Sequence, residues 1–524
     1  MGEHGTARVR QRIGGLDHHW NVIPLVPAKK SQLQRLMMVL QKGSFGPDVR
    51  RLQEQLGQLG FYAGKLDSDF GAQTDLALRD FQRRLGFFPD GKVAAVINQA
   101  IQSALGSPIP GANSCFQAFK TIQDNLFAQK AADANHLAFL DRGIDEVKPG
   151  DYPSLPKRTF PESPFKKQIP NYPFSLRVKP DGLTLVAPAD PAGLFQAYPL
   201  LGQRPAFESG GATNDTLAFL SDEIQQACLC LGRFDLEKGV MQARWFGRSA
   251  FHPVQFWSAT KYLSPIFVVC QANKKNPLIK IPDCKIHQKN SMRLPSDPGF
   301  EQLFLDMVSY RKGVARSNAV GLMFKRLCNP GEPNIQQWLS ALTGSAGLQF
   351  LGGYGVDPFI FQPELYASSG PLVTARDPGS SSNRVSAYDL VRVITMLGWH
   401  HSLVPAARLP GAQWHSLSSL VCGLGSDTAR YLDVALRQLR LDQVIQSPVI
   451  LSKLGFGTLN QGTDALTTAA FVQFIDPRST PRILRSFAFA LRLPTSAAQA
   501  PNHDAKMASE ITELVRRVVA DAWS

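Results

Sequence analysis

Near its N-terminus the chain contains two short segments in which apolar residues recur at intervals of three and four. Segments 49–59 and 78–85 follow this spacing, which places the apolar side chains of each on one face of a helix. Glycines near these segments provide turns with positive φ or close backbone approach. The pattern predicts a small helical bundle. The apolar positions are Val49, Leu52, Leu56, Leu59, Leu78, Phe81 and Leu85, and the glycines are Gly60, Gly64, Gly71 and Gly91.

From about residue 215 onward, strand-like and helical patterns alternate to the end of the chain. Ser386-Ala-Tyr-Asp389 has the form of a capping box and precedes a helical pattern, and 509–523 predicts a closing amphipathic helix. These features predict a second, larger domain. The predicted strands are 227–234, 240–246, 449–459, 466–475 and 484–493.

Four segments follow from these patterns. Residues 1–37 form a basic lead-in that we expect to be poorly ordered, and 38–105 form the helical bundle. Segment 106–214 has a helical part up to about 147 and then a run rich in proline, which disfavours regular helices and central strands. We interpret that run as a semi-rigid linker that wraps the larger domain, 215–524.

The formal net charge of +14 favours polyanionic surroundings such as cell-wall polymers, nucleic acid or anionic lipid. The basic residues are scattered, and no helix carries a basic stripe interleaved with aromatic residues, so we do not expect nucleic acid as a partner. No apolar segment approaches the roughly 20 residues that cross a bilayer, and no signal peptide is visible. The oligomeric state stays open.

Neither the cysteines nor the histidines suggest a metal site or a disulfide framework. Seven cysteines leave at least one thiol free in a monomer, and Cys228 and Cys230 alternate along an apolar segment that is typical of a buried strand. His18-His19 and His400-His401 are adjacent pairs, which cannot both face one metal from a regular helix or strand. We therefore predict no metal and no cofactor.

The helical bundle carries a dense set of glycine, aspartate, glutamine and aromatic positions between Gly43 and Gly91. Their order resembles the peptidoglycan-binding domain family, with Ser68 at the position where that family usually has glycine. The resemblance implies a three-helix domain that binds peptidoglycan; a structural bundle without ligand is the alternative. The candidate residues of this domain are Gly60, Tyr62, Asp67, Phe70, Gly71 and Gln82.

In the larger domain, Ser258 stands at a predicted helix start and Lys261 follows one turn later on the same face. A serine hydroxyl is a weak nucleophile unless a base lies within hydrogen-bond reach, and a lysine with a lowered pKa can accept its proton. The spacing alone also fits a capping serine beside a solvated lysine.

The order of elements around Ser258 resembles the serine β-lactamase and penicillin-binding-protein superfamily, class A β-lactamases in particular. The resemblance implies an α+β domain whose antiparallel sheet is flanked by helices. It implies that Ser258 is the acylated nucleophile, Lys261 its base partner and Lys453, in Ser452-Lys453-Leu454-Gly455, a cation lining the cleft. The backbone N–H groups of Ser258 and Phe456 would form the oxyanion hole.

The chain departs from the superfamily pattern at several positions. The second motif reads either Arg316-Ser317-Asn318 or Ala315-Arg316-Ser317, with Ser317 and Asn318 as candidate site residues. Leu454, before Gly455, replaces a hydroxyl residue that helps to hold a substrate carboxylate. Pro265 would kink a long helix that begins at Ser258. The deacylating carboxylate would be Glu364, although the register equally admits Gln362.

The sequence therefore predicts a peptidoglycan-binding bundle tethered to a serine acyl-transferase or hydrolase domain that acts on peptide stems or β-lactam-like amides. The alternative is a non-catalytic wall-binding protein whose β-lactamase-like domain has lost the reaction. The resemblances imply the periplasm or cell wall as the location.

Overall fold

The computed structural model describes most of the chain from residue 39 to residue 521. The N-terminal 38 residues, which include the predicted lead-in, and the segment 107–162, which includes most of the predicted helical part of the linker, lie outside the described residues. The described ranges are 39–59, 61–62, 64–84, 87, 89–106, 163–208, 215–310, 313–328, 333–375, 382–439, 441–442, 444–458, 464–495 and 500–521.

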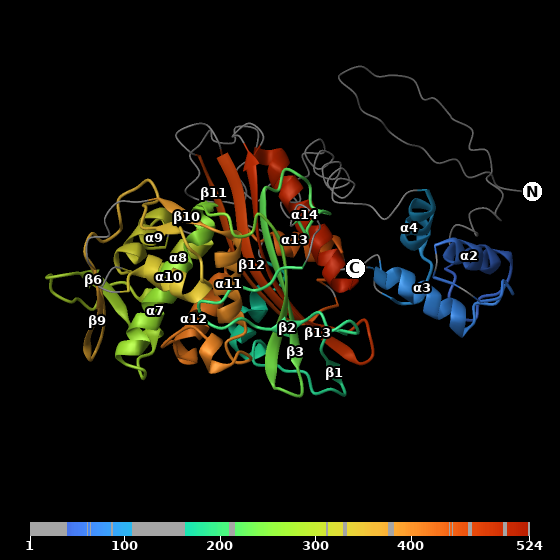
Figure 1. The fold of residues 1–524 in the computed structure, drawn as a ribbon, viewed down its shortest axis with the longest axis horizontal. Helices are drawn as coiled ribbons and strands as arrows, with labels where there is room; N and C mark the ends of the chain where they lie inside the picture. Colours follow the sequence, from blue (N-terminus) through green and yellow to red (C-terminus); the bar gives the residue numbers. More distant parts are fainter. Residues whose placement is uncertain are drawn as a thin grey trace, which may run out of the picture.

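The N-terminal unit contains three helices, as predicted. They are α2 (Pro47–Gln58), α3 (Ala72–Arg84) and α4 (Ala95–Gly106) (Figure 1). Helix α2 begins with proline at its first position, where no intrahelical N–H is required. The predicted apolar stripes meet in one hydrophobic core, which includes Val49, Leu52, Leu56, Leu78 and Phe81.

Two loops of this unit are built on the same hydrogen-bond pattern around a buried glutamine. Gln53 Nε2 donates to Asp67 Oδ1 (2.7 Å) and to the Asp69 carbonyl (3.0 Å), while Ser68 N–H donates back to Gln53 Oε1 (3.2 Å). Gln82 Nε2 donates in the same way to Asp90 Oδ1 (2.8 Å), and Gly91 N–H donates to Gln82 Oε1 (3.0 Å). The residue after each aspartate is left-handed. These glutamines therefore fix two equivalent turns.

The larger unit is an α+β domain built on a seven-stranded sheet, which confirms the predicted fold class. All five predicted long strands are present, and every neighbouring pair along the main path is antiparallel. The order is β11 (Gln446–Thr458), β12 (Asp464–Asp476), β13 (Arg482–Thr495), β3 (Gln226–Asp235), β4 (Val240–Arg248) and β2 (Gln196–Ala197), with β1 (Leu185–Val186) parallel to β13.

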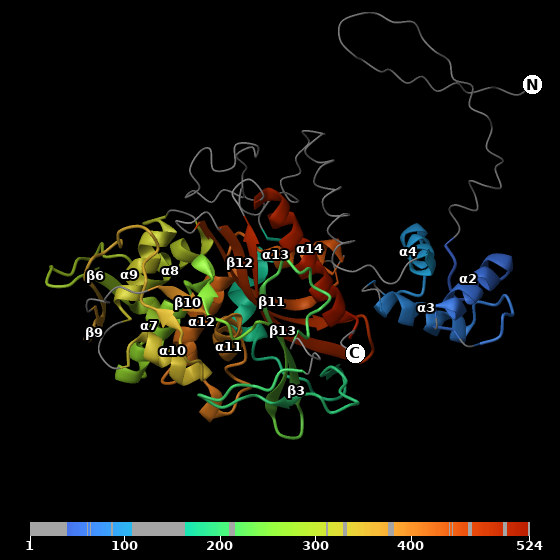
Figure 2. The same ribbon diagram turned by 45° about the horizontal axis from the view of Figure 1, so that its top comes forward.

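Helices cover both faces of this sheet, and the two cores that result explain why its strands read as nearly continuous apolar runs (Figures 1 and 2). In β3, Cys228 and Cys230 face a core that includes residues of α7 (Leu263–Lys275), α11 and α12, whereas Leu229 and Leu231 face a core with α13 and α14. The helices are α11 (Ala387–Gly398), α12 (Trp414–Gly425), α13 (Tyr431–Gln438) and α14 (Ala500–Val519).

A helical region with two small sheets lies beside the large sheet. One small sheet has the order β5 (Val254–Gln255), β10 (Asn383–Val385), β7 (Gln349–Phe350), and the other β6 (Lys285–Gln288), β8 (Pro363–Ala367), β9 (Gly370–Thr374). The remaining helices are α7 (Leu263–Lys275), α8 (Phe300–Ser309), α9 (Ser317–Arg326) and α10 (Ile335–Thr343), with the short turns η5 (Trp257–Thr260), η6 (Ile281–Asp283) and η7 (Pro405–Ala407).

Part of the segment predicted as a linker belongs to the body of the larger domain. Residues 163–208 include η3 (Lys166–Asn171) and α6 (Tyr172–Ser175), and the Tyr172 side chain is fully buried in the main core. Strands β1 and β2 join the large sheet. The prolines exclude long regular elements here, but two-residue strands and single helical turns remain compatible with them. In the described part of the chain, no helix is long and apolar enough to cross a membrane.

Candidate functional site

Ser258 lies on the short 3-10 turn η5, just before α7, and its side chain is half-buried. The preceding residue, Trp257, has a left-handed φ of 48°. Helix α7 begins only at Leu263, so Pro265 falls within its first turn, where the missing N–H costs no helical hydrogen bond. The predicted kink at Pro265 is therefore absent. Among the described residues, the Ser258 hydroxyl makes no side-chain hydrogen bond.

The backbone of β11 lies directly against η5. A Cβ atom added to Gly455 would stand 2.6 Å from Ala259 N and 2.7 Å from the Phe256 carbonyl oxygen, so this position requires glycine. The Thr467 hydroxyl of β12 donates to the same Phe256 carbonyl (2.7 Å). Phe456, the residue predicted to supply an oxyanion donor, is therefore the next residue along a strand that touches the Ser258 turn.

Lys261 joins this turn to the start of α9. Its fully buried Nζ donates to Ser317 Oγ and to Asn318 Oδ1, both at 2.6 Å. The Ser317 hydroxyl in turn donates to the Met307 carbonyl (2.7 Å). The structure thus places both predicted residues of the second motif against Lys261. Ala315, which would be the serine position in the other register, has no hydroxyl.

An aromatic contact to Lys261 comes from Tyr354. Its ring centroid lies 5.4 Å from Lys261 Nζ, and its hydroxyl lies 3.2 Å from Thr260 Oγ1. Burial raises the pKa of the Tyr354 hydroxyl, so the group stays neutral. No local motif in the sequence indicates this contact of Tyr354 with Lys261.

Lys453 is also fully buried, and Tyr310 covers it. The Tyr310 ring centroid lies 3.5 Å from Lys453 Nζ, and the Tyr310 hydroxyl donates to the Leu454 carbonyl (2.7 Å). Leu454 packs into the core on the other face of β11, because successive side chains of a strand alternate. Tyr310 was not predicted, since nothing local in the sequence indicates that the end of α8 meets β11.

A buried carboxyl from the segment between α12 and α13 contacts β11 beside Lys453. Asp427 accepts a hydrogen bond from the Ser452 hydroxyl (2.9 Å), and burial raises the pKa of Asp427 although the nearby Lys453 charge opposes this. Asp427 therefore helps to hold β11 in place through Ser452.

The structure does not bring Glu364 to Ser258. Glu364 lies on β8, where His287 (3.0 Å), Arg293 (3.2 Å) and Thr374 (2.9 Å) contact its carboxylate. Burial opposes its ionisation, but these hydrogen bonds outweigh burial and lower the pKa of Glu364. The prediction that Glu364 acts as the deacylating base therefore disagrees with the structure.

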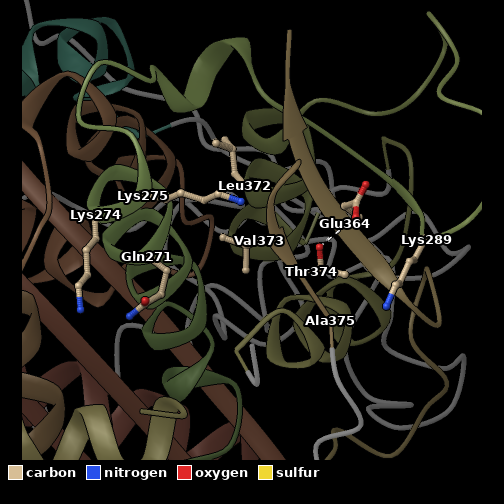
Figure 3. Close-up of a pocket in the computed structure, with 9 residues that line it drawn as sticks. All are labelled: Gln271, Lys274, Lys275, Lys289, Glu364, Leu372, Val373, Thr374 and Ala375. Carbon is tan, nitrogen blue, oxygen red and sulfur yellow. Dashed lines mark hydrogen bonds between the residues drawn. The ribbon is translucent and has the colours of Figure 1, made fainter. Parts of the chain in front are cut away.

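Glu364 lines a pocket of about 700 Å³ at the C-terminal end of α7 (Figure 3). Gln271, Lys274 and Lys275 of that helix line the same pocket. Because an α-helix rises about 1.5 Å per residue, the 13 residues of α7 span roughly 18 Å. Ser258 precedes the opposite end of this helix, and the two sites are therefore separate.

Most predicted residues of the N-terminal unit build its fold. Phe70 is buried in the core, Gln82 and Asp67 anchor the two equivalent turns, and the Tyr62 hydroxyl donates to the Lys65 carbonyl (2.6 Å). Gly71 begins the hydrogen bonding of α3, since Asp75 N–H donates to its carbonyl. Gly60 lies outside the described residues. No group of three His, Cys, Asp or Glu residues that could hold a metal occurs in the described ranges.

Comparison with known families identifies the N-terminal unit. Residues 45–96 match the family described as "Putative peptidoglycan binding domain". This segment is a peptidoglycan-binding domain. It is 44% identical over 66 residues to the spore cortex-lytic enzyme of Bacillus cereus, an alignment that covers 13% of this chain and 26% of that enzyme. It is also 49% identical over 47 residues to the N-acetylmuramoyl-L-alanine amidase CwlM of Mycobacterium tuberculosis, covering 9% and 12%. The chain spans about a quarter or less of these relatives.

The rest of the chain is structurally similar to class A β-lactamases. A representative class A β-lactamase from Bacteroides cellulosilyticus aligns with a TM-score of 0.33 and 10% sequence identity, covering 57% of this chain and 92% of that protein. The family match confirms the predicted peptidoglycan-binding domain, and the sheet and helices of the larger unit confirm its predicted α+β fold.

Proposed function

We propose that this protein binds peptidoglycan through residues 45–96 and acts at the cell wall as a serine acyl-transferase through Ser258. Support for the first part comes from the family match of the N-terminal domain. The second part is supported by the arrangement of Lys261, Ser317 and Asn318 around the Ser258 turn.

One observation carries the catalytic proposal. A half-buried serine hydroxyl without a protein partner among the described residues stands one turn before a buried lysine, and that lysine is held by Ser317 and Asn318. The β11 backbone at Gly455 packs on the same turn. Two backbone N–H groups, of Ser258 and Phe456, would serve as oxyanion donors, each typically worth roughly 3–4 kcal/mol of transition-state stabilisation.

The proposed step forms an ester. Ser258 Oγ bonds to the acyl carbon of an amide or ester while neutral Lys261 accepts the serine proton. The bond between the acyl carbon and the leaving nitrogen or oxygen then breaks, and Lys261 returns the proton to the leaving group. The products are an acyl ester of Ser258 and a free amine or alcohol.

The acyl ester is expected to be long-lived. The carboxylate that the family resemblance implied for deacylation, Glu364, lies at the far end of α7. Without that base, water attacks the ester slowly, which favours transfer or stable acylation over rapid β-lactam hydrolysis.

A non-catalytic wall-binding protein is the second candidate. The covering of Lys453 by Tyr310 favours it, because a cation that is fully buried beneath a ring does not line an open cleft. In this case the α+β domain keeps the fold without the reaction.

Intact-mass spectrometry separates the two candidates. The protein is incubated with a panel of activated esters and β-lactams beside Ser258→Ala and the control Ser291→Ala, which alters an exposed serine on the β6 turn. The catalytic proposal requires one acyl adduct that persists for hours in the wild type and the control and is absent from Ser258→Ala. No adduct with any donor would favour the non-catalytic candidate.

A further inference from the structure

Tyr310 lies close to both buried lysines of this site, Lys261 and Lys453. Its ring centroid is 3.5 Å from Lys453 Nζ and 5.6 Å from Lys261 Nζ, and its side chain is almost inaccessible, with the residue 6% exposed. The ring therefore occupies the space beside Lys453 that a substrate group would need in order to pair with the ammonium.

The backbone conformation of Tyr310 indicates that contacts of its side chain hold the ring in this position. The residue ends α8 in a left-handed conformation, with φ 56° and ψ 14°, which bulky residues adopt only at an energetic cost. That conformation carries the side chain onto β11, where the hydroxyl donates to the Leu454 carbonyl (2.7 Å). The contacts with β11 thus offset an unfavourable backbone geometry.

The Lys453 ammonium group makes stabilising contacts within the protein and does not depend on an anionic group of a substrate. Its Nζ donates to the Leu454 carbonyl (3.2 Å) and lies over the face of the Tyr310 ring, where the negative face of the aromatic system stabilises a cation. The Leu454 side chain offers no hydroxyl and points into the opposite core. A carboxylate would have to displace the ring to reach Lys453.

We propose that Tyr310 excludes anionic acyl donors, so that Ser258 reacts with neutral esters or internal amides that carry no carboxylate beside the scissile carbonyl. This inference rests on the proposed acylation of Ser258. It makes Tyr310 a specificity-determining residue, because the ring keeps a substrate carboxylate away from the Lys453 ammonium group. The ring does not cover the Ser258 hydroxyl in this proposal.

The test uses a matched pair of donors, benzylpenicillin and its methyl ester, which differ only in the carboxylate. The second-order rate of Ser258 acylation is measured by intact mass in the wild type, Tyr310→Gly and Tyr310→Phe. Glycine suits the left-handed backbone, and Asn290→Gly, at an exposed residue with φ 63°, controls for a glycine at positive φ.

In the wild type, Tyr310→Phe and Asn290→Gly, we expect the methyl ester to react at least tenfold faster than the free acid. In Tyr310→Gly the ratio falls below threefold, because the carboxylate then reaches Lys453. The proposal is overturned if the wild type prefers the free acid, or if the ratio in Tyr310→Gly equals that of the wild type.

A second measurement tests the covering of Lys453 without acylation of Ser258. Folded protein, verified by circular dichroism, is pulsed with acetic anhydride, and modification of Lys453 is quantified by peptide mass spectrometry against the exposed Lys274. We expect Lys453 to react at least tenfold faster in Tyr310→Gly than in the wild type, with Lys274 unchanged. Equal reactivity overturns the proposed role of Tyr310, whereas failure of every donor to label Ser258 overturns only the proposed function.

Discussion

Ser68 adopts a left-handed conformation, with φ 65°, at the position equivalent to Gly91 in the second glutamine-anchored turn. This conformation costs a residue with a Cβ atom roughly 1–2 kcal/mol, a cost that glycine avoids. Glycine also makes the unfolded chain more flexible, which offsets part of the gain in stability. We therefore expect Ser68→Gly to stabilise the peptidoglycan-binding domain by up to about 1 kcal/mol. The change in the free energy of unfolding is measured by urea titration, with hydrogen exchange of the core amides of this domain as the probe.

Gly91→Ala is the matched opposite of this substitution. An added Cβ would collide with the Asp75 carboxylate and stand 2.8 Å from Arg79 Nη2, in addition to the strain of φ 69°. We expect a clear loss of stability for Gly91→Ala. Equal effects of the two substitutions would contradict the equivalence of the turns.

At the level of single residues, the sequence predicts the groups that belong to local motifs. Ser258 and Lys261 lie one turn apart, and Ser317 and Asn318 begin a helix, so local patterns point to them as candidates, and the structure brings Lys261, Ser317 and Asn318 together. Tyr310 could not be found in this way, because residues 310 and 453, which contact each other, lie 143 positions apart in the sequence. Glu364 was predicted as the deacylating base by resemblance alone. No fixed spacing from Ser258 supported that prediction, so the sequence could not show where Glu364 lies in the fold.

Among the elements of the larger domain, α14 contains a buried carboxyl with a strongly shifted pKa. Burial raises the pKa of Glu510 to about 7, while the Ser221 N–H, Lys506 and Arg248 oppose this shift and Glu513 adds to it. The Glu510 side chain is fully buried, and its Oε2 accepts from Ser221 N–H (3.1 Å). Its Oε1 has no hydrogen-bond partner among the residues that the structure describes. A protonated Glu510 therefore suits the site better than a carboxylate does.

This shift predicts how stability depends on pH. The folded pKa lies above the usual value of 4.5, so the folded state binds the proton more tightly, and stability falls as pH rises from about 4.5 to about 7. Glu510→Gln keeps an acceptor for Ser221 and removes the titration. We expect it to stabilise the protein at pH 8 by on the order of 2–3 kcal/mol and to have little effect near pH 4.5.

Urea unfolding midpoints of the wild type and Glu510→Gln, measured from pH 4.5 to pH 8.5, check this prediction. The difference between the two midpoints should grow with pH and level off above about 7. Parallel pH profiles would show that Glu510 does not titrate in this range.

The long elements were predictable because each has a strong local pattern. All five predicted long strands appear within a few residues of their expected limits, and Ser386 and Asp389 form the predicted capping box of α11. The strands β1 and β2 were not predicted, since two-residue strands depend only on the partner strand that they meet. For the same reason the proline-rich segment 163–208 was interpreted as a linker.

For the molecule as a whole, the two units have distinct hydrophobic cores. The core around Val49, Leu56 and Phe81 contains no residue of the clusters that flank the large sheet. Each unit therefore has the means to fold and act on its own, and wall binding should be separable from chemistry at Ser258. Tethering of a binding domain raises the local concentration of a second site at the same surface.

We expect the full chain to sediment with insoluble peptidoglycan and a chain lacking residues 39–106 to remain in the supernatant. Both proteins should form the Ser258 adduct with a soluble ester at the same rate, because the deletion leaves the larger core intact. Sedimentation is repeated in about 0.5 M NaCl, where the screening length falls to a few ångströms, since a net charge of +14 alone would retain the protein on an anionic polymer. Retention that survives salt and is lost with residues 39–106 would assign binding to the N-terminal domain; retention lost in salt would assign it to charge.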